Sequence, residues 1–279
     1  MHKVFTLCFF CCIIKYFGGD KMITLLNKFD DNYVMKEKDI LDIASSYIKD
    51  NNLEKYLSDV VFNPNTSHLG YYNVRTNEIV LNDEKIIKFA YQLYDKLTSK
   101  YDVDENYYTY FLNFYYLYII YHELSHVSQK AKYENNLNDE NIFNYLYELC
   151  FKLRQDSIQL YKDNHDLFPM EIDATNNAYL KAHTLMTYTK LPSKECKLMY
   201  IQYLRSLSNN YKKINDNQIS CPIEKLALEN EIVDLEKIEE LLNKSKLSKI
   251  ERMNLGLDIT VKEYDSVLKE KEKCLIKYK

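Results

Sequence analysis

The sequence has few of the residues that interrupt helices. Its 279 residues include only four glycines and four prolines, so sharp turns are scarce and long helices are favoured. It also has no block of lysine or arginine, because basic and acidic residues are interleaved and the formal net charge is −4. We therefore expect no nucleic-acid partner. The hydrophobic fraction of 46% is sufficient for a substantial core.

The seven cysteines form no framework for disulfides or for a cysteine zinc site. Cys8 and Cys11 have C-x-x-C spacing, but they lie with Cys12 in an apolar run and no second pair follows. A four-cysteine zinc site needs two such pairs. We therefore expect reduced thiols and a cytoplasmic protein. The other cysteines are scattered along the chain: Cys150, Cys196, Cys221 and Cys274.

The segment 1–21 combines a basic start with an apolar run over residues 4–14. The run is too short to span a bilayer, so we expect no stable membrane insertion. It resembles a signal peptide in shape but lacks a small-x-small cleavage site. A secreted or membrane-associated protein is therefore the alternative to a cytoplasmic one. We favour an incorrectly assigned start, with Met22 as the true initiator.

The hydrophobic pattern predicts a mainly α-helical protein with one small β-hairpin, an α+β fold. We assign residues 22–215 to the main domain and residues 216–279, which are rich in charge, to a helical C-terminal appendage. The hairpin is expected over residues 71–74 and 78–81. A loop is expected before it, over residues 62–70.

The expected helices follow from apolar periodicity and from capping residues. Two capping boxes, Ser248-x-x-Glu251 and Thr260-x-x-Glu263, predict short helices near the C-terminus, and Gly256 can end the first of them. The longer helices are expected over 39–56, from a cap at Asn82 or Asp83 to about 100, over 107–132, from a cap at Asn138 or Asp139 to about 160, over 169–188, and over 193–211.

The helix predicted over residues 107–132 contains His-Glu-Leu-Ser-His at residues 122–126, an H-E-x-x-H motif. On a helix His122 and His126 lie one turn apart and point the same way, so they can hold one Zn²⁺ at about 2.0–2.1 Å. Glu123 is a little over a quarter turn away and can act as general base on zinc-bound water. The alternative is an amphipathic helix whose histidines only bond to carbonyls. Residues 110–121 are nearly all apolar or aromatic, however, and unpartnered polar groups on such a buried helix are costly.

A catalytic zinc site needs a third protein ligand, and Glu171 is the best candidate. Pro169 favours a helix start, which places Glu171 in the first turn. Ala174, Ala178 and Ala182 follow on one face and would permit close packing against the motif helix. An acid in the first turn also suits the helix dipole, so a purely structural role is the alternative. The other candidates for the third ligand are Asp173, His165 and, more distantly, Glu148.

The motif followed by Pro169-x-Glu171-x-x-Ala174 resembles the gluzincin pattern, and most of all the ImmA/IrrE-type metallopeptidases of bacteria and phages. The resemblance covers about residues 60–190 and implies a minimal zincin-like catalytic core. It also implies that an edge strand beside the motif helix binds the substrate, either residues 71–74 or 78–81. The sequence departs from the family in its longer spacing, with Glu171 45 positions after His126. Gln129 occupies the position where three-histidine zincins have glycine, which argues against that type.

We therefore expect a zinc-dependent metallopeptidase acting on a protein or peptide. In this interpretation His122, His126 and Glu171 hold Zn²⁺, and Glu123 takes the proton from the attacking water and passes it to the leaving amine. The alternative is a non-catalytic binding or regulatory protein in which zinc is a structural clamp. Glu123 would be dispensable in that protein.

Overall fold

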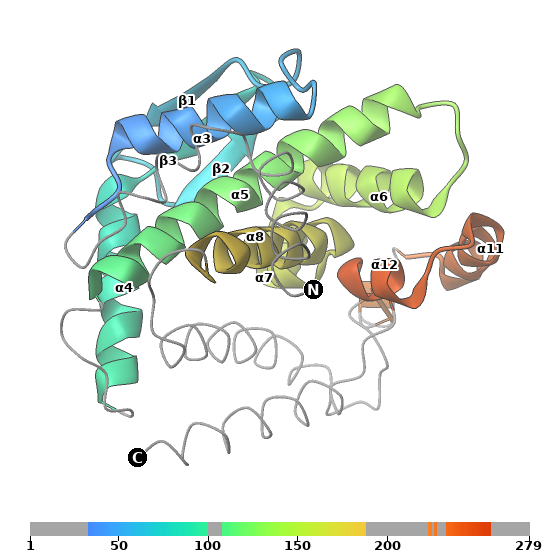
Figure 1. Cartoon of the computed structure of the whole chain (residues 1–279). Helices are drawn as coiled ribbons and strands as arrows, with labels where there is room; N and C mark the ends of the chain where they lie inside the picture. Colours follow the sequence, from blue (N-terminus) through green and yellow to red (C-terminus); the bar gives the residue numbers. More distant parts are fainter. Residues whose placement is uncertain (1–32, 100–107, 188–222, 225, 228–232, 258–279) are drawn as a thin grey trace, which may run out of the picture. The chain divides into compact units, whose positions relative to one another are not determined.

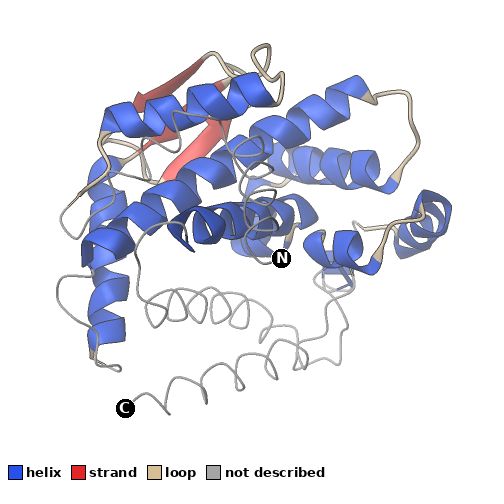
Figure 2. Ribbon diagram, viewed as in Figure 1, coloured by secondary structure: helices blue, strands red, loops and turns tan. Residues whose placement is uncertain are grey.

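The structure is a computed structural model that describes residues 33–99, 108–187, 223–224, 226–227 and 233–257. It is mainly helical with one small three-stranded sheet, which confirms the predicted α+β class (Figures 1 and 2). Several predicted features lie outside the described residues. They are the N-terminal segment 1–21, the helix over 193–211, the capping box at Thr260 and the boundary between residues 215 and 216.

The chain divides into two compact units. The first unit comprises residues 1–128 and 178–198, and the second comprises residues 129–177 and 199–279. Two helices contribute to both units, α5 (Tyr108–Asn135) and α8 (Pro169–Thr187). Both lie close to their predicted bounds, and α8 begins at the predicted proline.

Helix α5 is the core element of the first unit. Its half before the motif is buried on nearly every side, as its unbroken apolar and aromatic sequence predicts. A polar side chain buried in this half of α5 makes specific hydrogen bonds. The side chain of Asn113 is fully buried, donates to the carbonyl of Tyr33 and accepts from the backbone N–H of Met35. These hydrogen bonds therefore fix the part of α5 that precedes the two histidines.

The sheet comprises β1 (Asp59–Phe62), β2 (Gly70–Asn73) and β3 (Glu78–Leu81) in the order β1-β3-β2. Strands β2 and β3 form the predicted antiparallel hairpin, with Asn77 in the left-handed region at its turn. Strand β1 pairs in parallel with β3 and was not predicted, because four residues give too short a pattern. The predicted loop therefore starts after Phe62 and ends before Gly70. Residues 78–81 form the central strand, so their assignment as an edge strand was wrong.

Helix α3 (Glu37–Asp50) starts and ends earlier than predicted. It ends in a Schellman motif: the N–H of Leu53 bonds the carbonyl of Ile48 at 2.9 Å, and the N–H of Asn52 bonds that of Lys49 at 3.3 Å. Asn52 takes the left-handed conformation that the motif requires, with φ 54°. The paired asparagines at 51 and 52 therefore end the helix, although the apolar pattern continues to Tyr56.

Helix α4 (Asp83–Thr98) begins after Asn82, as predicted. The Oδ1 of Asn82 accepts from the N–H of Lys85, which is a normal helix cap. Its amide also donates to the carbonyls of Pro64 and Thr66. One fully buried side chain thus fastens both the helix start and the loop that leads into β2.

The second unit contains α6 (Ile142–Asp156), α7 (Ile158–Asn164) and a 3₁₀ turn η2 (His165–Leu167) ahead of α8. A continuous helix to about residue 160 was predicted, and this was wrong. Ser157 adopts φ −145° and ψ 62°, which ends α6 and starts α7. The cap of α6 is Asn141, three residues later than the first predicted candidate. Sequence alone gave no strong signal for the break, since Asp156 and Ser157 are only moderately weak helix formers and no glycine or proline lies there.

The C-terminal part of this unit includes α11 (Leu235–Ser245) and the short α12 (Lys249–Asn254). The capping box at Ser248 is present, because the Ser248 N–H and hydroxyl both donate to Glu251. Gly256 ends this region with φ +69°, as predicted. It packs so closely on Ile172 of α8 that a Cβ at residue 256 would overlap the Ile172 side chain.

Candidate metal centre

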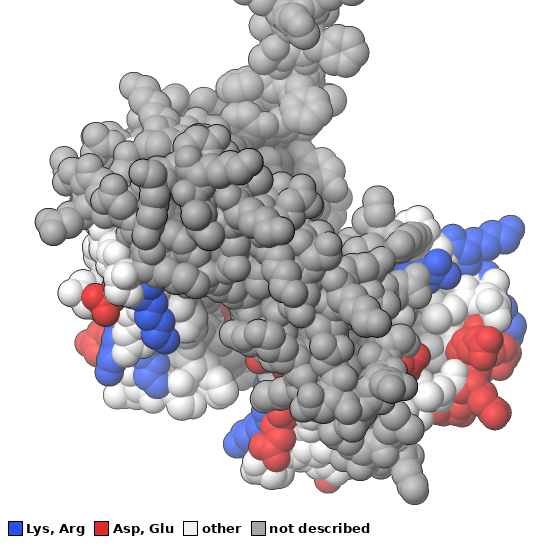
Figure 3. Space-filling view, turned by 90° about the horizontal axis from the view of Figure 1, so that it is seen from below, with Lys and Arg blue, Asp and Glu red and all other residues white. Residues whose placement is uncertain are grey.

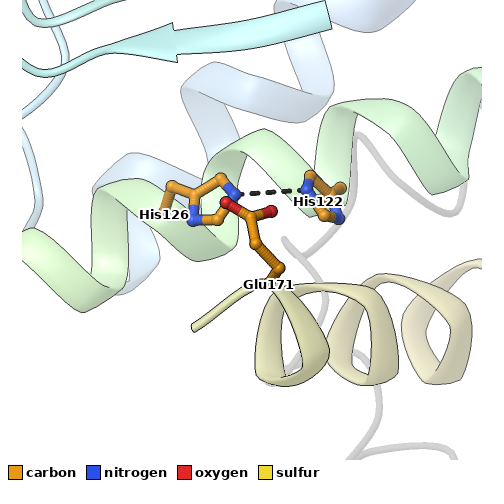
Figure 4. A group of neighbouring side chains, drawn as sticks. All are labelled: His122, His126 and Glu171. Carbon is orange, nitrogen blue, oxygen red and sulfur yellow. Dashed lines mark hydrogen bonds between the residues drawn. The ribbon is translucent and has the colours of Figure 1, made fainter. Parts of the chain in front are cut away.

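The structure brings together the two histidines of the motif and one acid from a later helix. His122 and His126 project from α5 and Glu171 from the first turn of α8, and the three side chains point toward one another (Figure 4). One potential ligand atom from each lies within 4.8 Å of the other two. In the part of the chain that the structure describes, no other set of three His, Cys, Asp or Glu residues has this arrangement.

The spacing of the two imidazoles suits a shared metal ion. The Nε2 atoms of His122 and His126 are 3.1 Å apart, and their ring planes are nearly perpendicular. Two nitrogens bound to one tetrahedral zinc at about 2.0–2.1 Å lie about 3.4 Å apart. The rings therefore need to move by only a few tenths of an ångström to share an ion.

The chemistry of the three donors also fits zinc. Two imidazole nitrogens and one carboxylate oxygen form the three-protein-ligand set of a catalytic site, which leaves a fourth position for water or substrate. Glu171 is only 7% exposed, and a buried carboxylate is costly unless a cation or donors stabilise it. Both histidines are half-buried, so their side chains retain contact with solvent.

The Glu171 carboxylate has two neighbours on the same oxygen. The hydroxyl of Tyr161 donates to its Oε1 at 2.8 Å, and the Nε2 of His165 lies 3.2 Å from that atom. Burial alone would lower the pKa of His165, but the carboxylates of Glu171 and Asp166 outweigh it and raise that pKa to about 10. The raised pKa favours the charged form of His165 and an ion pair with Glu171.

The other candidates for the third ligand lie outside the group. Asp173 accepts from the amide of Gln129 at 2.8 Å and from that of Asn177 at 3.1 Å. His165 contacts Glu171 itself, and Glu148 accepts from the hydroxyl of Tyr133 on an exposed surface. Of the four candidates from the sequence, the structure places only Glu171 beside both histidines.

Glu123 lies on α5 directly after His122, and its side chain is only 5% exposed. Its Oε1 would be 3.4 Å from a Cβ added at Gly70, the first residue of β2. The same Cβ would come within 2.9–3.0 Å of Leu81 and Ile119. The absence of a side chain at Gly70 thus lets β2 approach α5 at the carboxylate of Glu123.

From the sequence, no role at the candidate site was assigned to three residues that lie near it. Gln129 lies three residues after His126 on the same face of α5, and its amide also donates to the carbonyl of Met170 at 2.9 Å. Its position in the helical period was a usable signal. Gly70 is one of only four glycines, which was a second signal. Tyr161 gave none, because it is one of 27 tyrosines.

Comparison with protein families, with curated proteins and with solved structures found no match to this chain. The functional argument therefore depends on the site itself. Within the described residues, no helix has both the length and the apolar character that a membrane span requires.

Proposed function

We propose that this protein is a zinc-dependent metallopeptidase of the gluzincin type, most similar to the ImmA/IrrE-type enzymes. The observation that carries the proposal is the clustering of His122, His126 and Glu171, which come from two different helices, with Glu171 45 positions after His126. A motif on one helix can arise by chance. A buried carboxylate on a second helix, facing both histidines, is a much more specific arrangement.

The protein residues have separate roles in the proposed reaction. His122, His126 and Glu171 would hold zinc, which supplies Lewis acidity to water and to the scissile carbonyl when bound. Glu123 takes the proton from the attacking water and transfers it to the leaving amine. Its position directly after His122 on α5 supports this role, because the H-E-x-x-H pattern places that carboxylate next to the two histidines.

The edge of the sheet offers a place for an extended peptide. Strand β2 pairs with β3 on one side, and no other described strand pairs with it on the opposite side. A peptide bound there would add main-chain hydrogen bonds to β2. Because Gly70 of β2 lies against Glu123, that peptide would run close to the general base. This favours residues 70–73 over residues 78–81 as the substrate-binding strand.

The proposed substrate is a protein or peptide, with no nucleic acid and no membrane partner. On the face drawn in Figure 3, basic and acidic side chains of the described residues occur in small groups of both signs. The proposal of no nucleic-acid partner rests on the sequence, in which basic and acidic residues are interleaved and the formal net charge is −4. The proposed compartment is the cytoplasm, which agrees with the free, buried thiol of Cys150.

The decisive experiment compares the zinc-loaded protein with Glu123→Gln on a proteome-derived peptide library. Glutamine has the shape of glutamate but cannot accept the proton from water. We expect new peptide termini with the wild type, and at least about a 100-fold lower rate with the variant, in line with the typical contribution of general acid–base catalysis. Zinc content should be equal in the two proteins.

The rival function is a structural zinc clamp, which has no use for Glu123. Equal zinc content with no cleavage by either protein would favour the clamp. Cleavage at the wild-type rate by Glu123→Gln would reject the proposed mechanism. The control variant is Glu134→Gln on the last turn of α5. It changes the same functional group outside the site and should leave cleavage unchanged.

A further inference from the structure

Two side chains that the proposed reaction does not use converge on Glu171. Tyr161 comes from the middle of α7 and His165 from the turn η2, and both contact Oε1 of the carboxylate, at 2.8 Å and 3.2 Å. Both precede Glu171 by ten residues or fewer and belong to the same unit of the chain. The contacts are therefore made locally, by the turn that leads into α8.

Contacts with two neighbouring rings hold Tyr161 in this position. Its ring stacks on Phe168, with centroids 5.1 Å apart and planes inclined by 18°, and it meets His165 edge-on at 5.3 Å. Phe168 is fully buried, and its carbonyl accepts from the N–H groups of Glu171 and Ile172. The residue directly before α8 thus also supports the tyrosine that bonds to Glu171.

The break between α6 and α7 is what makes this arrangement possible. Ser157 ends α6, and the N–H of Tyr161 bonds the carbonyl of Ser157 at 3.0 Å as the first turn of α7 forms. If the helix continued without interruption from residue 142, the Tyr161 side chain would point in a different direction. The backbone conformation of Ser157 therefore affects which side chains contact the Glu171 carboxylate.

We propose that Tyr161 and His165 are positioning residues that orient the Glu171 carboxylate for zinc binding. This inference rests on the proposed function, because it assigns a role within the same zinc site. A glutamate side chain has three rotatable bonds, and ordering it on zinc costs conformational entropy. Two donors on one carboxylate oxygen reduce that cost before zinc arrives.

The expected loss of zinc affinity follows from what is typical of other zinc sites. Ligating carboxylates and histidines are usually held by a second set of hydrogen bonds, and removing one such partner typically weakens metal binding about 10–100-fold. Tyr161→Phe removes the hydroxyl but keeps the ring that stacks on Phe168. We therefore expect Tyr161→Phe to weaken zinc binding by about 10-fold or more.

The second unit contains a matched control. The hydroxyl of Tyr133 donates to Oε1 of Glu148 at 2.9 Å, and the Tyr133 ring stacks on Tyr147 at 4.6 Å. This is the same pair of residue types with nearly the same bond length, but it is exposed and outside the zinc group. Tyr133→Phe should leave zinc affinity unchanged, so it separates an effect on the site from the loss of any Tyr–Glu bond.

The experiment measures zinc affinity by competition with a chromogenic chelator, together with the visible spectrum of the cobalt-substituted protein. The proteins are the wild type, Tyr161→Phe, Tyr133→Phe, His165→Ala and His165→Gln. His165→Ala should resemble Tyr161→Phe, whereas His165→Gln keeps a donor and should recover part of the affinity. The cobalt spectrum should change with Tyr161→Phe and not with Tyr133→Phe.

The possible results separate this inference from the proposed function. If the wild type binds zinc and Tyr161→Phe binds it equally well, with the same cobalt spectrum, the positioning role is wrong and the peptidase proposal stands. If Tyr161→Phe and Tyr133→Phe lower the melting temperature alike and neither changes zinc affinity, Tyr161 has only a structural role. If the wild type binds no zinc, both proposals fail together.

Discussion

The first two turns of α8 contain two acidic residues with different surroundings. Glu171 faces the ring nitrogens of His122 and His126 (Figure 4), whereas Asp173 accepts from the side-chain amides of Gln129 and Asn177. The two acids are two residues apart, so they lie about 200° apart around the helix. We call these the zinc face and the packing face of α8.

The comparison shows that neighbours determine the role of a carboxylate. Asp173 meets uncharged amide donors, which satisfy it and fasten α8 to the last turns of α5. Glu171 meets imidazoles, which would themselves be ligands in the proposed zinc site. Changes on the zinc face should therefore alter metal binding, and changes on the packing face should alter stability.

The largest effect is expected on removing a histidine from the zinc face. The wild type should bind about one zinc per chain, and His122→Ala or His126→Ala should lose more than about 100-fold in affinity, beyond the range of outer contacts. Metal analysis after purification measures this. The control is His68→Ala, since His68 lies in the loop before β2 against Tyr71 and should not affect zinc. Full zinc in both variants would rule out the proposed site.

The next effect concerns the two acids themselves. Glu171→Ala should weaken zinc binding by more than about 100-fold, because a ligand is lost and not only a neighbour that positions a ligand. The helix should persist, since alanine is the better helix former. Asp173→Ala should leave zinc affinity within about threefold of the wild type. Titration with a competing chelator tests both variants, and the reverse outcome would make Asp173 the ligand.

A smaller effect is expected from the packing face. Asp173→Ala and Gln129→Ala each remove the bond between these side chains and should cost about 1–2 kcal/mol of unfolding free energy. The double variant should cost less than the sum, because both single changes remove the same bond. Urea unfolding of the four proteins measures the coupling. Strict additivity would mean that this bond does not stabilise the packing of α8 on α5.

The smallest effect is expected from deleting residues 1–21. Both faces of α8, their partners on α5 and the described core all come after Met22. The shortened chain should bind zinc with the same stoichiometry and unfold at nearly the same temperature. Metal analysis and thermal unfolding provide the test. Aggregation or loss of zinc by the shortened protein would show that the segment contributes to the fold.

Local patterns predicted much of the fold. The H-E-x-x-H helix, the start of α8 at Pro169, the hairpin and the capping box at Ser248 depend on residues close in sequence, and all are present. The errors have a different cause. The ends of α3 and α6 depend on a left-handed Asn52 and on an unusual conformation at Ser157, which apolar periodicity does not register.

For the candidate site, the sequence by itself determined the two histidines and Glu123, because a helix places residues four apart on one face whatever surrounds it. It also indicated Glu171, but only among several acids. The tertiary structure decided among them, since only the packing of α8 on α5 and the turn through η2 bring one carboxylate to the imidazoles. It also decided which strand lies at the edge, because strand order depends on contacts between residues far apart in the chain.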